Sequence, residues 1–78
     1  MNLQDFIAHF AEQFDETDPA TIQADTKFKD LDEWSSLTAL TIIAMVDSEY
    51  DLKITGEDIR QSETVSDLFN RLSTKSVS

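Results

Sequence analysis

The sequence predicts an all-α fold, an antiparallel four-helix bundle with one short helix and a long first loop. Three observations support this fold class. Apolar residues recur at helical spacing near the start, the middle and the end of the chain. Residues that favour helix N-caps precede the expected helices. The 78 residues include one glycine and one proline, which is too few for an architecture rich in β-turns.

The first helix is predicted to begin at Leu3 and to end at the acidic segment 15–19. Asn2 can cap it, and Asp5 is placed like the acid of a capping box. His9 is the single histidine and has no catalytic partner in the sequence, so we expect it to be structural. One face of this helix is apolar at helical spacing, through Leu3, Phe6, Ile7, Phe10, Ala11 and Phe14.

A long loop is predicted between the first helix and the central one. Pro19 favours a short helical turn with Asp18 as its cap. The stretch 23–35 is long and needs anchors in order to be ordered. Phe28 and Leu31 are the expected anchors.

The central helix, residues 37–50, is the most apolar part of the chain. The row 37, 40, 43, 46 and 50 follows helical spacing and is predicted to face the core. Ile42 and Met45 widen the apolar surface, so this helix is either central or partly exposed for a partner. Ser35 and Ser36 stand where a helix N-cap is expected.

Trp34 directly precedes the two serines. We interpret it as a hydrophobic staple, in which a side chain before the N-cap packs onto a residue one turn into the helix. The alternative is direct contact with a partner. One exposed tryptophan alone is weak support for that alternative.

Two further helices are predicted after the central one. Thr55, with Asp58 three residues later, caps a short helix that ends near Gln61. Thr64, with Asp67 three residues later, caps the last helix. The apolar face of that helix is formed by Val65, Leu68, Phe69 and Leu72.

We expect a single domain over residues 1–74 and a disordered tail over residues 75–78. The predicted core contains residues from three helices. They are Phe6, Phe10, Leu40, Ile43, Val46, Val65 and Leu68.

Charge and composition exclude several classes of function. Six Lys and Arg against sixteen Asp and Glu give a net charge of −10, which argues against nucleic-acid binding and favours basic protein partners. There is no cysteine, so disulfides and thiolate sites are excluded. We see no apolar run of about 18 residues and no signal peptide, so we expect no membrane insertion and a cytoplasmic location.

No catalytic or metal site is expected. The acidic segment 47–58 is not an EF-hand loop, because Leu52 stands where that loop needs glycine. The sequence shows no phosphate loop, no metal-binding histidine pair and no nucleophile elbow. The two serines have no histidine base at a plausible local spacing.

The segment 28–37 resembles the approach to the phosphopantetheine serine of acyl carrier proteins. The family pattern is Asp-Ser-Leu, then a hydrophobic helix with an acidic and aromatic end. Here it reads Ser35-Ser36-Leu37, then the helix, then Asp47-Ser48-Glu49-Tyr50. The resemblance continues without gaps, covering the chain from about residue 3 to residue 72. Two departures are Ser35 in place of the usual aspartate and the absence of the usual loop glycine.

This resemblance implies a discrete acyl carrier protein with an acyl carrier protein-like fold. Ser36 would be the attachment point for 4'-phosphopantetheine, which a separate phosphopantetheinyl transferase moves from coenzyme A. The thiol of that arm would hold acyl intermediates as thioesters for fatty-acid, polyketide or related acyl-transfer pathways. The chain would be a non-catalytic monomer. Its other partners would be acyl-transferring or synthase enzymes with basic or apolar docking surfaces.

The resemblance also places partner recognition around the start of the central helix. Thr38 and Thr41 stand at positions that are commonly acidic in the family, so we expect a less electrostatic and more apolar surface. The residues expected to take part are Trp34, Ser35, Leu37, Thr38, Thr41, Ile42 and Asp47.

Two alternatives remain open. An aminoacyl or peptidyl carrier has the same core motif. A non-modified helical interaction module of the same fold would use Ser36 only as a helix cap.

Overall fold

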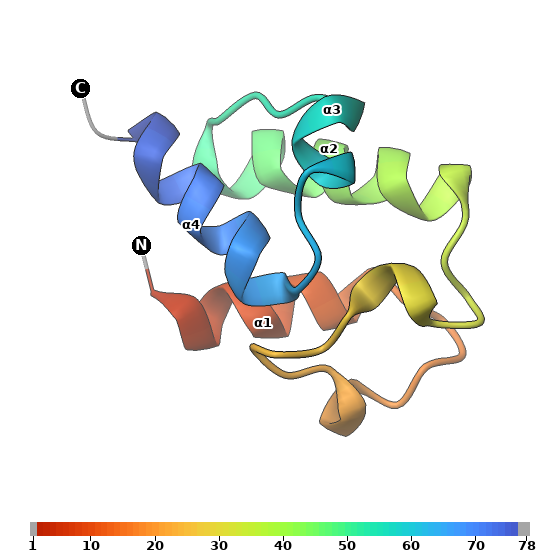
Figure 1. The fold of residues 1–78 in the computed structure, drawn as a ribbon. Helices are drawn as coiled ribbons and strands as arrows, with labels where there is room; N and C mark the ends of the chain where they lie inside the picture. Colours follow the sequence, from red (N-terminus) through yellow and green to blue (C-terminus); the bar gives the residue numbers. More distant parts are fainter. Residues whose placement is uncertain (1, 77–78) are drawn as a thin grey trace.

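The structure, a computed structural model, describes residues 2–76. These residues form four α-helices and two short 3-10 turns, with no strand (Figure 1). The helices are α1 (Leu3–Glu12), α2 (Ser36–Tyr50), α3 (Gly56–Arg60) and α4 (Val65–Ser76). The turns η1 (Pro19–Thr21) and η2 (Phe28–Asp30) lie in the long connection between α1 and α2. The predicted fold class is therefore confirmed.

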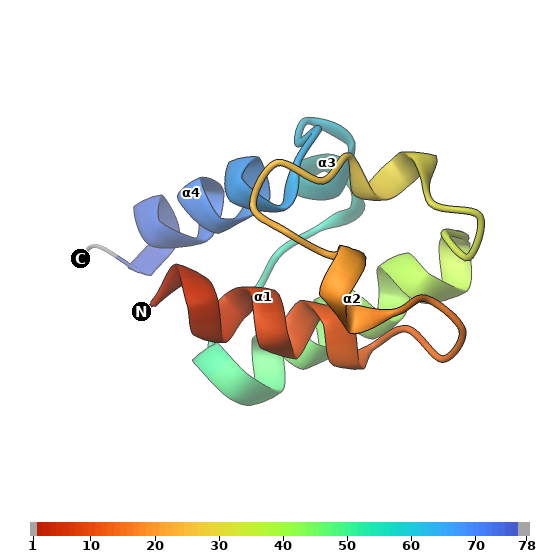
Figure 2. The same cartoon turned by 90° about the horizontal axis from the view of Figure 1, so that it is seen from below.

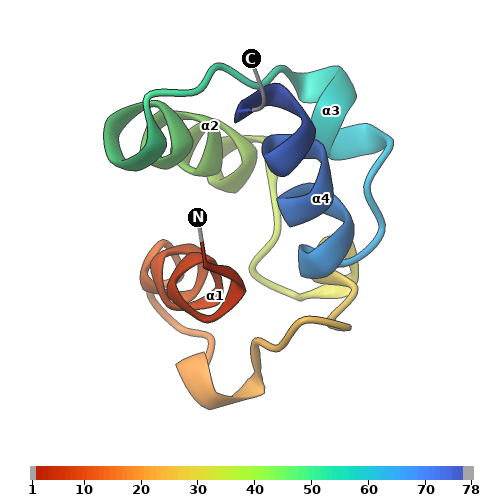
Figure 3. The ribbon, with the colours of Figure 1, turned by 90° about the vertical axis from the view of Figure 1, so that its left-hand side faces the viewer.

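The helices enclose one core. Helix α1 contacts both α2 and α4, and α3 contacts α4. Figure 3 shows α1, α2 and α4 arranged around a common interior. Figure 2 shows the long connection leaving the end of α1, with η1 beside that helix, before it returns to the start of α2.

The core draws on all four helices and on the loop. Its fully buried side chains include the predicted Phe6, Phe10, Val46, Val65 and Leu68. The other buried apolar residues are Ala11, Phe14, Ile22, Phe28, Ile42, Met45, Ile54, Ile59 and Leu72. Of the expected loop anchors, Phe28 is buried and Leu31 is partly buried against the core, so the loop is pinned at both positions.

The predicted N-cap residues Asn2, Thr55 and Thr64 are confirmed, but Asp5 makes no reciprocal capping-box hydrogen bond to Asn2. The side chain of Asn2 accepts hydrogen bonds from two backbone amides in the first turn of α1, at 2.8 and 3.2 Å. Thr55 and Asp58 form a reciprocal capping box at the start of α3. Thr64 Oγ1 accepts from the backbone N–H of Asp67 at 3.1 Å, and Asp67 Oδ2 accepts from the backbone N–H of Thr64 at 3.1 Å. Each cap satisfies donors that a helix terminus leaves free.

The predicted core face of α2 is wrong. Leu40 is 62% exposed and Leu37 is 73% exposed, whereas Ile42 is fully buried together with Val46. Ile43, which we expected in the core, is partly buried. The side of α2 that faces the core runs instead through residues 38, 42, 45 and 46.

The error has a physical cause. Apolar residues occupy almost every side of α2, so the periodicity of this segment defines its core face poorly. The packed face is selected by contact with α1 and the rest of the core, which the sequence of α2 alone does not contain. Thr38 is tolerated inside because its Oγ1 donates a hydrogen bond to the backbone oxygen of Glu33 at 3.0 Å.

Helix α4 continues beyond the predicted domain boundary. Lys75 and Ser76, which we expected in a disordered tail, are helical. Lys75 Nζ lies 3.5 Å from Asp58 Oδ2 and so links the end of α4 to α3. Residues 77–78 of the predicted tail lie outside the described residues, and the single domain over residues 1–74 stays a prediction.

Asp58 joins α3 to α4. Its carboxylate is buried, accepts from the backbone N–H of Thr55 at 2.9 Å, and lies 2.9 Å from Arg71 Nη2 and 3.5 Å from Lys75 Nζ. Burial alone would raise the pKa of Asp58, but the hydrogen bond from Thr55 and the two cations outweigh burial and hold that pKa below its usual value. The group therefore stays ionised and stabilises the fold.

We predict that Asp58→Asn lowers the free energy of unfolding by about 1–3 kcal/mol at neutral pH, because a buried charge-assisted network is weakened. The lowered pKa fixes the sign of the pH dependence. The contribution of Asp58 is complete above the ordinary aspartate pKa and is lost as the pH falls through the lowered one. Urea unfolding from neutral to acidic pH measures this, with the exposed Asp25→Asn as the control. Equal stability of Asp58→Asn and wild type at neutral pH would contradict the prediction.

Candidate functional site

The two serines at the start of α2 have different roles. Ser35 is the N-cap, and its Oγ accepts from the backbone N–H of Thr38 at 3.4 Å and lies 3.3 Å from Thr38 Oγ1. Ser36 is the first residue of the helix and is exposed. Its hydroxyl makes no hydrogen bond to another described residue. Ser35 therefore caps the helix, and the Ser36 hydroxyl is free for chemistry.

Trp34 holds the chain just before the serines. Its ring stacks on Phe14 with centroids 6.4 Å apart and meets the edge of Phe28 at 4.9 Å. These rings come from the residue that follows the α1 C-cap and from η2, whereas the staple interpretation expects a contact in the first turn of α2. Trp34 is thus packed on the loop side of the site, which fixes where α2 begins.

Glu33 also holds this segment, and the sequence did not single it out. Its carboxylate accepts from the backbone N–H groups of Asp15 at 2.7 Å, Glu16 at 3.0 Å and Thr17 at 2.9 Å, and from Thr17 Oγ1 at 2.8 Å. Desolvation would raise the pKa of Glu33, but the hydrogen bonds from Thr17, Asp15 and Glu16 together hold it below its usual value. No local signal predicts this contact, because its partners lie 16–18 residues away.

A hollow of about 550 Å³ lies beside Ser36, between α2 and α3. Its apolar lining comes from Trp34, Ala39, Leu40, Ile43 and Ile59, and its charged lining from Lys29 and Arg60. A group attached to Ser36 would therefore have both apolar side chains and cations beside it in this hollow.

The two cations of the hollow are held differently. Arg60 Nη2 pairs with Glu57 Oε1 at 2.7 Å. Lys29 Nζ donates to the backbone oxygen of Arg60 at 2.9 Å and pairs with no carboxylate within residues 2–76. An anionic group on Ser36 would therefore share this hollow with the Lys29 ammonium group, and it would also lie at a helix N-terminus, where the dipole favours negative charge.

The other predicted recognition residues separate into two sets. Leu37 is exposed, and Thr41 is half-buried with its Oγ1 donating to the backbone oxygen of Leu37 at 3.0 Å. Asp47 lies near the far end of α2 and pairs with Lys53 at 3.1 Å. Thr38 and Ile42 are buried, so our expectation that they belong to an exposed partner surface is wrong.

Three residues of the site were missed by the sequence reasoning. Leu40 was placed in the core but is exposed beside Ser36. Lys29 and Arg60 are 31 positions apart, and the fold alone brings them together. Composition gives one indirect signal for these two cations, namely that basic residues are scarce, with only six in the whole chain.

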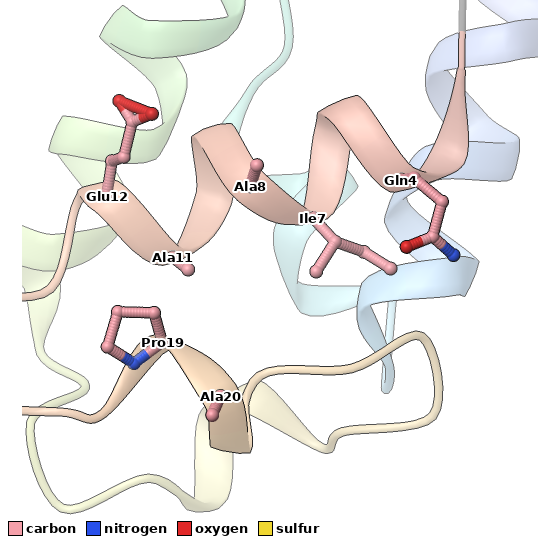
Figure 4. A pocket seen from close by; sticks show the side chains of 7 residues that line it. All are labelled: Gln4, Ile7, Ala8, Ala11, Glu12, Pro19 and Ala20. Carbon is pink, nitrogen blue, oxygen red and sulfur yellow. The ribbon is translucent and has the colours of Figure 1, made fainter.

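A second hollow, of about 470 Å³, lies between α1 and η1 (Figure 4). Figure 4 shows Ala11 and Ile7 on the side of α1 that faces the Pro19–Ala20 turn, with the Glu12 carboxylate pointing away. No nucleophile or cation lines this hollow. It is separate from the Ser36 site.

Two other kinds of functional feature, a metal site and a membrane-spanning helix, are absent from the described residues. No group of three or more His, Cys, Asp or Glu within residues 2–76 is placed to hold a metal ion. In the same part of the chain, no helix is long and apolar enough to cross a bilayer.

Comparison with protein families decides the class of this site. The family model described as "Phosphopantetheine attachment site" matches residues 4–72, which is most of the chain. The chain belongs to the phosphopantetheine-binding carrier family. Searches of curated proteins and of solved structures found no match.

Family membership confirms three predictions made from the sequence: the resemblance, the absence of a catalytic role and the cofactor. Carrier domains of this family are non-catalytic and bear a covalent 4'-phosphopantetheine group. Such a domain works with a phosphopantetheinyl transferase and with enzymes that use the loaded arm. In this carrier domain, the free Ser36 hydroxyl and the adjacent hollow fit such a group, because Lys29 and the start of α2 suit its phosphate.

We predict that the two serines differ in their effect on stability. Ser35→Ala should lower the free energy of unfolding by about 1 kcal/mol, because the N-cap oxygen is lost. Ser36→Ala should change it by less than about 0.5 kcal/mol, since this exposed hydroxyl has no hydrogen-bond partner within residues 2–76. Urea denaturation of the two variants measures the difference. A larger loss in Ser36→Ala would mean that Ser36 is the cap.

Proposed function

We propose that this carrier domain holds acyl intermediates as thioesters on 4'-phosphopantetheine bound to Ser36, for fatty-acid, polyketide or related acyl-transfer pathways. The observation that supports this proposal best is the free, exposed Ser36 hydroxyl at the first position of α2, next to an apolar hollow. A cytoplasmic, monomeric state stays a prediction.

Ser36 is favoured over Ser35 by its hydrogen bonding. Ser35 Oγ is engaged with Thr38, whereas the Ser36 hydroxyl has no partner among the described residues. Among residues 2–76, no side chain hydrogen-bonds to the Ser36 hydroxyl as a general base would. The single histidine, His9, lies 3.8 Å from Glu49 at the opposite end of α2. The transferase must therefore supply the base.

An acyl cargo is favoured by the surface next to Ser36. When attached, phosphopantetheine supplies a thiol on a flexible arm, and that thiol binds the cargo. Leu40, Ile43 and Ile59 line the hollow beside the attachment point with apolar side chains. Burial of an alkyl chain against them is stabilising, at roughly 25 cal/mol per Å² of apolar surface removed from water. A polar aminoacyl group gains less there.

The partner surface is proposed to centre on Leu37 and Leu40. These are the exposed large hydrophobic residues of the described chain. No charged residue occurs between Glu33 and Asp47, so this stretch has little electrostatic character of its own. Partner enzymes are then expected to dock through apolar contacts, with the −10 charge acting mainly on encounter.

Intact mass after incubation with coenzyme A and a broad-specificity transferase tests the attachment site. We expect wild type and Ser35→Ala to gain one phosphopantetheine and Ser36→Ala to gain none. Loading that depends on Ser35 instead would move the site by one residue. A wild-type chain that several transferases fail to load would identify a non-modified interaction module.

The cargo is tested on the loaded protein. We expect octanoyl-phosphopantetheine to shift the side-chain methyl resonances of Leu40, Ile43 and Ile59, and alanyl-phosphopantetheine to leave them near the holo positions. The reverse pattern would favour an aminoacyl carrier.

The docking surface gives a further prediction. Leu37→Ala and Leu40→Ala should each lower kcat/KM for loading by about fivefold, as expected for truncated contact residues. Both should keep the free energy of unfolding within about 0.5 kcal/mol of wild type, because the side chains are exposed. The buried control Ile42→Ala should lose about 2–5 kcal/mol. Normal loading of both leucine variants would remove these residues from the transferase interface.

A further inference from the structure

The Glu33 carboxylate joins two parts of the loop that are distant in sequence. Oε1 accepts three hydrogen bonds, from Glu16 N, Thr17 N and Thr17 Oγ1, at 2.8–3.0 Å. Oε2 accepts one, from Asp15 N, at 2.7 Å. One side chain thus satisfies three consecutive backbone amides that follow α1. We call this set of four hydrogen bonds the Glu33 latch.

The backbone carbonyl group of Glu33, in contrast to its side chain, contacts the first turn of α2. Its carbonyl oxygen accepts from Thr38 Oγ1 at 3.0 Å, and the Thr38 amide in turn donates to the Ser35 cap. Trp34, the next residue, is packed between Phe14 and Phe28. Glu33 therefore connects the end of α1 to the first turn of the helix that bears Ser36.

The choice of a carboxylate here is unusual on charge grounds. Asp15 and Glu16 lie on the facing segment, Asp32 precedes Glu33 in its own segment, and no cation pairs with Glu33 within residues 2–76. Repulsion among these acidic side chains disfavours an ion at this place. The four donors compensate for it, because an ionised carboxylate offers only acceptors and binds backbone amides strongly.

We propose that Glu33 is a positioning residue for the loading of Ser36, holding the segment 33–36 in the conformation that the transferase must bind. This inference rests on the proposed function of Ser36. Glu33 touches neither Ser36 nor any reacting group, and acts through Trp34, Ser35 and Thr38. Glu33 acts by preorganisation, because less conformational entropy is lost when the transferase binds a segment that is already ordered.

Loading kinetics separate positioning from general stability. Glu33→Gln keeps the shape but puts an amide NH₂ where one of the two acceptors was, so at least one donor loses its partner. We expect KM for the carrier to rise roughly tenfold, as for other losses of substrate orientation, with kcat close to wild type. Glu63→Gln, an exposed site with the same charge change, is the matched control and should load normally.

Two further variants test the mechanism. Thr17→Val removes one donor of the latch, keeps the backbone amides and should raise KM by a smaller factor. In the Glu33→Gln background its effect should shrink, because the two residues act through the same contact. Leu72→Val destabilises the core at α4 and should leave KM unchanged at a temperature where the protein is folded.

Trp34 provides a readout that does not depend on loading. It is the single tryptophan and neighbours Glu33, so its fluorescence and its quenching by acrylamide report on this segment. Glu33→Gln should increase quenching while circular dichroism stays native. Wild type should show the same change as the pH falls through the lowered pKa of Glu33, and Glu33→Gln should lack that transition.

The outcomes are distinguishable. A wild-type protein that loads at Ser36, together with a Glu33→Gln variant whose KM and Trp34 quenching lie within twofold of wild type, overturns this inference and leaves the proposed function intact. An equal rise of KM in Leu72→Val shows that Glu33 acts only through stability and also overturns it. A wild-type protein that is never loaded removes both proposals.

Discussion

A series of aromatic rings extends from the first helix to the start of the second. Phe10 contacts Phe6, Phe14 and Phe28, with ring centroids 6.0, 5.6 and 5.4 Å away. Trp34 completes the series by contacting both Phe28 at 4.9 Å and Phe14 at 6.4 Å. Aromatic pairs contribute about 0.5–1.5 kcal/mol each beyond the area they bury. A small domain without cysteine has few other means of ordering a long connection. The position of Ser36 depends on this series, because it fixes the residue from which α2 starts.

Several of the acidic side chains accept hydrogen bonds from backbone N–H groups at helix starts and in the loop. Asp18 caps η1, Asp58 completes the cap of α3, and Asp67 binds the amides before α4. Glu33 does the same for the loop after α1. The sixteen acidic residues are therefore more than a solubilising surface, since those near chain reversals replace hydrogen bonds that a helix or strand would otherwise supply.

The features that the sequence predicted correctly are local ones. Caps such as Asn2 and Thr55 involve partners two or three residues away, and the α1 face follows one clear period. The side of α2 that faces the core was predicted wrongly because α2 is apolar almost all round. For that reason Leu40, which we expected in the core, is exposed, and Ile42, which we expected at the partner surface, is buried. These errors affected the partner surface more than the fold.

Features that depend on contacts between residues far apart in the chain could not be predicted from the sequence. The proposed site serine, Ser36, was chosen from a resemblance over about residues 3–72, and its separation from the cap became visible only in the geometry of Ser35 and Ser36. The Glu33 latch and the hollow with Lys29 and Arg60 join segments from different parts of the chain. Nothing in the local pattern distinguishes these residues from other charged residues on the surface.

The replacement of the usual aspartate by Ser35 fits this arrangement. Serine and aspartate are comparable N-caps, so Ser35 keeps the hydrogen bond to the Thr38 amide. It also removes a negative charge from the position next to the proposed attachment point, Ser36. The stretch from Trp34 to Val46 then has no charge, and the nearest charged groups lining the hollow are Lys29 and Arg60. Despite a net charge of −10, no acidic side chain lines the hollow beside Ser36, although Glu57 pairs with the lining residue Arg60. We therefore propose that the acidity of this carrier domain influences how partners approach, while contact at Ser36 uses the apolar surface of the hollow and Lys29.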